Sequence, residues 1–134
     1  MFSRFSPAAK RVLRSAEQAC RNHNHYYVGV GHLLLALVEE HDAGVEARLS
    51  ALGTNPADVA RAVRTALGTG DDRLWDGILI TPRLRSVVAV AERESPEGAI
   101  EPVHLLDAIV VEGTGLAAEI LARQGTVASR RVSG

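Results

Sequence analysis

The sequence predicts an all-α fold built from two copies of one helical unit. Its composition is 46% hydrophobic but only 4% aromatic, which favours closely packed helices over a sheet of β-branched and aromatic residues. Apolar residues recur at helical spacing. The segment Ile80-Thr81-Pro82 also restates Phe5-Ser6-Pro7 after 75 residues. At 134 residues the chain has the length of one domain.

The first copy, residues 5–67, carries four predicted helices. The first begins at Pro7 with Ser6 as N-cap, because a proline there lacks only an N–H group that the helix start leaves unpaired anyway. The second covers the apolar run 33–38. The third ends at Gly53, and the fourth begins at the Asn55-Pro56 pair.

The second copy, residues 80–125, follows a linker at 68–79. His104-Leu105-Leu106 restates His32-Leu33-Leu34 at an offset of 72 residues, and Gly125 matches Gly53 at the same offset. We therefore expect the third helix of this copy to end at Gly125. Only a short tail, residues 126–134, remains, so the last helix should be short or missing.

A duplicated unit of this kind is expected to bury one face against its own copy, giving a pseudo-twofold double bundle. The single tryptophan, Trp75, falls in the linker. We expect it to pack the linker against the bundle, because tryptophan is usually buried in large part.

Charge and hydropathy exclude several functional classes. The net charge is −1, whereas phosphate binding to nucleic acid needs a strongly basic surface. No apolar run reaches the roughly 18 residues of a membrane span, and the N-terminus does not read as an export signal. The lone Cys20 cannot form an internal disulfide and lies on an apolar helical stripe. These features predict a cytoplasmic protein that binds neither nucleic acid nor membrane.

Catalytic, metal and cofactor sites are not predicted. The pair His23 and His25 lacks further ligands at metal-binding spacing. The acidic pairs Asp71-Asp72 and Glu39-Glu40 show no apolar cleft that would tune them for acid–base chemistry. Neither a phosphate-binding G-x-x-x-x-G-K-[ST] loop nor a Gly-x-Ser-x-Gly nucleophile motif occurs. We expect a binding protein and no enzyme.

Four segments together resemble the N-terminal domain of the Clp family of AAA+ unfoldases, especially the ClpC type. They are Met1-Phe2-Ser3-Arg4-Phe5, Gly29-Val30-Gly31-His32-Leu33-Leu34-Leu35, Ala51-Leu52-Gly53 and Ile80-Thr81-Pro82-Arg83. The resemblance runs from Met1 to about Gly125. It implies a non-catalytic helical double repeat that receives substrates and adaptor proteins and passes them to a hexameric ATPase ring.

The sequence departs from the family's motif at one functional position in each copy. In ClpC-type domains the second helix of each repeat opens with Gly-Thr-Glu-His, and the glutamate recognises phosphorylated arginine. The matching residues here are Gly31 and Val103, whose side chains cannot accept a hydrogen bond from a guanidinium group. We therefore expect no phosphoarginine recognition of the family type.

The histidines of that motif remain as His32 and His104, each in the first turn of a predicted helix. We expect a structural role for both, because a ring nitrogen at a helix start can pair with backbone groups that the helix leaves free.

The resemblance also implies a ligand-binding face along the first helix of each copy, used in the family by some adaptors and by cyclic peptide antibiotics. Its residues here are Phe2, Lys10, Leu13, Arg14, Ile80, Arg83 and Arg85. Ile80 replaces an aromatic residue, Arg14 an apolar one, and Ala89 an acidic one. A different ligand is therefore expected at this face.

Local charge supports that expectation independently of the resemblance. Residues 1–21 contain five cations, Arg4, Lys10, Arg11, Arg14 and Arg21, against one anion, Glu17. If the first helices of the two copies are neighbours, Arg83, Arg85 and Arg93 extend this basic surface. Such a surface suits acidic, partly apolar peptides. The alternative is a solvated basic face without a partner.

Three functions stay open from the sequence. The first is a module that binds proteins or peptides, namely Clp substrates, adaptors or the unfoldase itself. The second is a decoy that sequesters cyclic peptide antibiotics and other ligands of a Clp unfoldase. The third is a structural domain that self-associates through apolar surface left uncovered by the shortened last helix. Whether the chain is a stand-alone protein or an excised domain is equally open.

Overall fold

The computed structural model describes residues 3–23, 25, 27–68, 79–95 and 97–133, and it describes their side chains up to Gln124 except that of Leu79. Five residues that the sequence analysis singled out lie outside the described residues: Met1, Phe2, Asp71, Asp72 and Trp75. The helices and two short strands follow one another along the chain in the order α1 (Pro7–Asn22), β1 (Tyr27–Val28), α2 (Val30–Glu39), α3 (Ala43–Ala51), α4 (Pro56–Leu67), β2 (Leu79–Ile80), α5 (Pro82–Glu94), α6 (Pro102–Glu112) and α7 (Gly115–Ser133).

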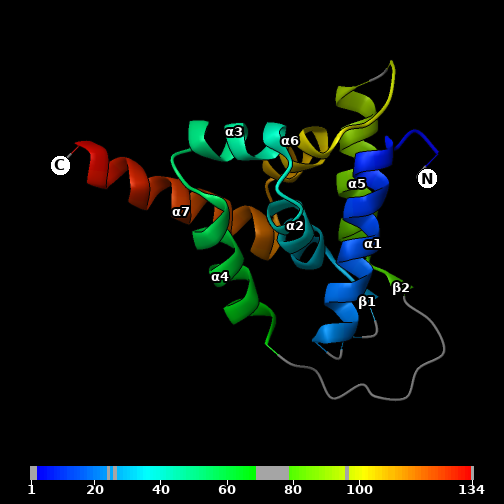
Figure 1. Ribbon diagram of the computed structural model, residues 1–134, viewed down its shortest axis with the longest axis horizontal. Helices are drawn as coiled ribbons and strands as arrows, with labels where there is room; N and C mark the ends of the chain where they lie inside the picture. The colour runs from blue at the N-terminus through cyan, green and yellow to red at the C-terminus, as the bar shows by residue number, and fades with distance from the viewer. Residues whose placement is uncertain (1–2, 24, 26, 69–78, 96, 134) are drawn as a thin grey trace.

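The predicted all-α double repeat is confirmed, with the two-residue strands as small additions. Helix α1 packs on α2, and in the second copy α5 packs on α6. Helix α2 lies at the centre of the molecule (Figure 1) and is buried over nearly its whole length. The core around it is contributed by both copies.

The predicted helix starts are also confirmed. The Ser6 hydroxyl accepts a hydrogen bond from the Ala9 amide at 3.1 Å, and the Thr81 hydroxyl accepts one from Leu84 at 3.2 Å. Asn55 accepts from the Asp58 amide at 2.9 Å. Each cap pairs one of the amides that a helix start leaves without a partner.

The predicted helix end at Gly125 is wrong. Gly53 follows α3 with φ of +85° and precedes the Asn55-Pro56 pair, and a residue before proline is disfavoured in helical conformation. No proline follows Gly125, and a single glycine inside a helix costs only about 1 kcal/mol relative to alanine. Helix α7 therefore continues through Gly125 to Ser133, pointing away from the bundle (Figure 1).

Short segments that precede helices in one copy pair with the corresponding segments of the other copy. Val28 pairs with Ile80 in the parallel β1–β2 ladder, and Phe5 pairs with Ile100 in a separate parallel bridge. Phe5 and Ile80 are equivalent at the 75-residue offset, and Val28 and Ile100 at the 72-residue offset. Each copy thus contributes one strand to both pairings, as a twofold relationship requires.

The helices cross between copies in the same way. Helix α3 of the first copy packs on α6, and α7, its counterpart, packs on α2. Among the described residues no helix is both long and apolar enough to cross a membrane.

Candidate functional site: a basic face on α1 and α5

Helices α1 and α5 run alongside each other in opposite directions (Figure 1). The Phe5–Ile100 bridge joins the start of α1 to the segment after α5, whereas the β1–β2 ladder joins the segment after α1 to the start of α5. The pseudo-twofold pairing therefore places the first helices of the two copies on one side of the molecule.

Helices α1 and α5 together carry seven exposed cations, and we call this set the basic face. They are Lys10, Arg11, Arg14 and Arg21 on α1, and Arg83, Arg85 and Arg93 on α5. None of them forms an ion pair with another described residue. Four arginines on other helices do form such pairs: Arg48 with Asp107, Arg61 with Asp58, Arg64 with Glu39, and Arg123 with Glu119. Among the side chains that the structure describes, unpaired positive charge is therefore concentrated on the first helix of each copy.

Arg4, counted with these cations in the sequence, has a different role. Its guanidinium group donates to the backbone carbonyls of Glu92 and Gly98 at 3.1–3.3 Å and to that of Ser95. These carbonyls lie at the end of α5 and just after it, where a helix has no internal donors left. Arg4 ties the two copies together and is not part of the basic face.

The apolar residues predicted for the face are less accessible. Leu13 is half-buried on α1, and Ile80 is half-buried in β2 against the core. Ala89 on α5 is exposed. The described part of the face is thus a charged surface with a limited apolar component.

Arg83 borders a hollow of about 480 Å³ at the start of α2. Its walls include Gly31, Leu67 and Leu116, and none of its described lining residues is acidic. A Cβ atom on Gly31 would lie 3.0 Å from the Leu67 Cδ2 atom, so Leu67 already occupies the space next to this position. Val103, the equivalent in the second copy, is half-buried with its Cβ 3.5 Å from the point where a Gly44 Cβ would lie.

The structural role predicted for His32 and His104 is confirmed. The Nδ1 atom of His32 accepts a hydrogen bond from the Gly29 amide at 3.0 Å, and that of His104 accepts one from the Glu101 amide at 2.9 Å. Each histidine occupies the third position of its helix and pairs the amide of the N-cap residue, as the glutamate of a capping box does.

The sequence analysis did not predict the contact between His25 and His32, because this contact depends on the conformation of the turn after α1. Their rings lie edge to face with Nδ1 of His25 2.8 Å from Nε2 of His32. Burial, followed by the neighbouring His25 and His23, lowers the pKa of His32 to about 4. No group of three or more His, Cys, Asp or Glu side chains in the described ranges is arranged to hold a metal ion.

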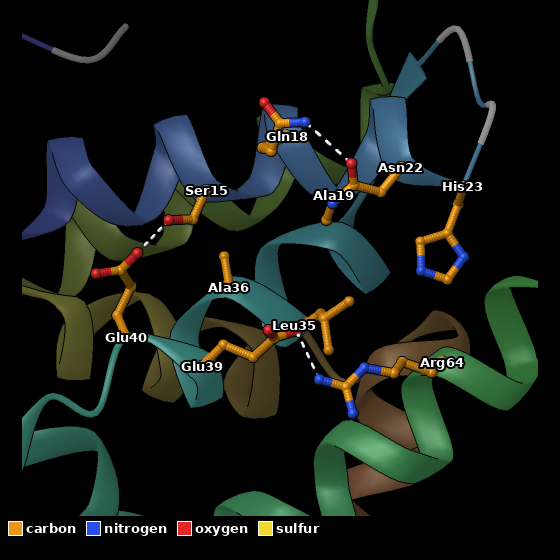
Figure 2. A pocket seen from close by; sticks show the side chains of 10 residues that line it. All are labelled: Ser15, Gln18, Ala19, Asn22, His23, Leu35, Ala36, Glu39, Glu40 and Arg64. Carbon is orange, nitrogen blue, oxygen red and sulfur yellow. Dashed lines mark hydrogen bonds and ion pairs between the residues drawn. The ribbon is translucent and has the colours of Figure 1, made fainter.

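A second hollow, of about 440 Å³, lies between α1, α2 and α4 (Figure 2). The small side chains of Ala19 and Ala36 leave room for it. Its charged groups already have partners: Glu39 pairs with Arg64 at 3.2 Å, and Glu40 accepts a hydrogen bond from Ser15. His23 contacts the Gly68 carbonyl at 2.6 Å. Residues of three helices line this hollow, and its described carboxylate and guanidinium groups already have partners.

Two interlocked helical copies with a charged outer face define a helical-repeat module. The chain belongs to the Clp repeat (R) N-terminal domain family, which matches residues 4–97. It is 30% identical over 128 residues to the negative regulator of genetic competence ClpC/MecB of Bacillus subtilis (strain 168). It is 32% identical over 129 residues to the chloroplastic chaperone protein ClpC of Pisum sativum.

Both matches cover 93% of this chain but only 16% and 14% of the relatives, so the chain spans about one-seventh to one-sixth of their length. The structure is also similar to the N-terminal domain of the chaperone ClpD from Arabidopsis thaliana, with a TM-score of 0.65 and 18% identity over 98% of this chain and 99% of that one. The ClpC-type resemblance is confirmed. A cytoplasmic location stays a prediction, because the relatives include chloroplastic proteins.

Proposed function

We propose that this domain is a non-catalytic docking module for substrates or adaptors of a Clp unfoldase, and that it binds acidic, partly apolar segments through the basic face. The observation that carries the proposal is the segregation of unpaired charge. All seven cations of the face are exposed without a described ion pair, whereas Arg48, Arg61, Arg64 and Arg123 on other helices are paired.

Electrostatic complementarity of this kind raises association rates and selects partners by charge. The half-buried Leu13 and Ile80 add apolar contact area beside the cations. Acidic segments carrying Leu or Phe side chains therefore match the face better than basic or purely polar ones.

The experiment is a titration of the whole chain with fluorescent peptides of Glu, Leu and Phe, compared with the same peptides carrying Lys in place of Glu. We expect the acidic peptides to bind, and to bind more weakly as salt is added. Arg11→Glu with Arg14→Glu should reduce their affinity at least about tenfold, since two attractive contacts become repulsive. Arg61→Glu, on the exposed surface of α4, is the matched control.

Equal binding of acidic and basic peptides would reject the proposal, as would unchanged affinity in the double variant. A pull-down from the source lysate with the same variants extends the test to whole proteins. The partners that disappear with Arg11→Glu and Arg14→Glu, but not with Arg61→Glu, are those that use the basic face.

We also propose that phosphoarginine is not recognised in the family manner. Gly31 and Val103 lack an acceptor group, and Leu67 fills the space beside Gly31. Calorimetric titration of the chain with phosphoarginine should give no binding heat. Gly31→Glu with Val103→Glu restores the two carboxylates, and binding by that variant alone would identify their loss as the cause. Binding by the natural chain would contradict the proposal.

A further inference from the structure

Comparing the two copies reveals a face that is covered in one and open in the other. At the 72-residue offset α2 corresponds to α6 and α3 to α7. In the first copy α4 packs across both α2 and α7. No described segment takes the place of α4 on the equivalent pair, α6 and α3, because α7 runs straight on to Ser133.

The consequence is visible in equivalent residues. Val38 on α2 is 2% exposed beside α4, whereas its counterpart Val110 on α6 is 43% exposed. The next residue, Val111, is 55% exposed. Val103, Val110 and Val111 share one side of α6, because helical residues seven or eight positions apart lie on the same face.

Helix α3 forms the second wall of this open surface. Arg48 on α3 donates to Asp107 on α6 at 2.7 Å, and Gly44 faces Val103. The counterparts of Gly44 and Arg48 on α7 are Leu116 and Ile120, which border a hollow against α4. The α6–α3 face therefore has the position, within the second copy, of the surface that α4 covers in the first.

Helix α4 shows what kind of segment fits such a face. It buries Val59, Ala60 and Val63 on one side. Its Arg64 extends from the edge to pair with Glu39 on α2. Helix α6 carries Asp107 and Glu112 but no Lys or Arg. Asp107 is already paired with Arg48, so Glu112 is the acidic group that favours a helix with a basic edge.

We propose that the α6–α3 face, centred on Val110 and Val111, binds in trans an amphipathic helix of a partner protein with the chemistry of α4: small aliphatic residues on one side and arginines along the edge. Helix-in-groove binding uses apolar anchors one turn apart, as α4 presents them to α2. This face is distinct from the basic face, and the inference does not depend on the proposed function.

The probe is a fluorescent, helix-stabilised peptide with the sequence of residues 55–68, added to the intact chain. We expect saturable binding followed by anisotropy. Val110→Asp with Val111→Asp should weaken it at least about tenfold, because a buried carboxylate without a partner opposes binding. Val111→Ser is the milder variant in case the double change disturbs folding, which circular dichroism reports. A peptide with Val59→Asp and Val63→Asp should not bind.

Ala89→Asp, on the exposed side of α5, is the matched control and should leave peptide binding unchanged. The proposal is overturned if the folded natural chain does not bind the peptide, or if the Val110 and Val111 variants bind it equally well. Sedimentation equilibrium tests whether a second copy of the chain fills the face instead. A dimer of the natural chain that Val111→Ser dissociates would mean that a second copy, and not a partner helix, occupies it.

Discussion

The Nε2 atom of His32 lies 2.8 Å from the Nδ1 atom of His25 in the interior beneath the start of α2. Because the Nδ1 atom of His32 already accepts the Gly29 amide, neutral His32 carries its proton on Nε2 and donates it to His25. Protonation of His32 at Nδ1 would remove the acceptor that caps α2. The interior at this point therefore requires His32 to be neutral.

Acid should destabilise the fold through His32. Its pKa is lowered to about 4 in the folded protein, against about 6.5 in an unfolded chain, so the unfolded state takes up more protons between these values. The associated stability is fully present above about pH 6.5 and is lost as the pH falls towards 4, by up to about 3 kcal/mol. Urea denaturation at pH 7, 5.5 and 4 measures this loss.

His32→Gln keeps an acceptor for the Gly29 amide but cannot titrate, so the free energy of unfolding should depend less on pH in this variant. His41→Asn is the control, because His41 is exposed and asparagine tolerates its positive φ of 55°. A pH dependence identical in the natural chain and His32→Gln would contradict the assignment.

A methyl group on Gly115 should destabilise the protein more than one on Gly98. Both have positive φ, +85° and +82°, so alanine is strained at either position by about 1 kcal/mol. At Gly115 the added Cβ would also lie 2.7–2.9 Å from the side chain of Arg83, whereas at Gly98 nothing lies within 4 Å. Thermal unfolding of Gly115→Ala and Gly98→Ala separates the contact from the strain. Equal effects would show that Arg83 moves aside freely.

Removing the Arg4 guanidinium group should weaken the contact between the copies. Arg4→Met keeps most of the aliphatic chain but leaves the carbonyls of Glu92 and Ser95 without this donor. We expect a loss of about 1–3 kcal/mol in the free energy of unfolding, because the hydrogen bonds involve a charged donor and are partly buried. Arg48→Met should cost less than about 1 kcal/mol, since its ion pair with Asp107 is exposed. The reverse order would refute this account of the two arginines.

Cys20 should react slowly with thiol reagents in the folded protein. Its side chain is buried, its sulfur lies 2.9 Å from the carbonyl oxygens of His25 and Tyr27, and burial raises its pKa. Thiolate is the reactive form and is scarce here. Labelling with an aromatic disulfide reagent at pH 8 should be fast in denaturant and slow without it. Fast labelling of the native protein would mean that the turn after α1 opens readily.

The sequence predicted local features well because they depend on neighbouring residues. The caps Ser6 and Thr81 and the capping role of His32 follow from residue type and position. The end of α7 was missed because Gly125 alone does not stop a helix when no proline follows. The pairing of Arg4 with the end of α5 and of His25 with His32 joins segments whose approach only the three-dimensional arrangement determines.

The reciprocal strand pairing makes the present chain a covalently tied equivalent of a symmetric dimer. Phe5 reaches across to Ile100, and Ile80 reaches back to Val28, which is the mutual exchange that two identical subunits make about a twofold axis. Neither half has its strand partner within itself. A half-length fragment would expose an unpaired edge at each of these places, so we expect the complete pair to be the smallest cooperative folding unit.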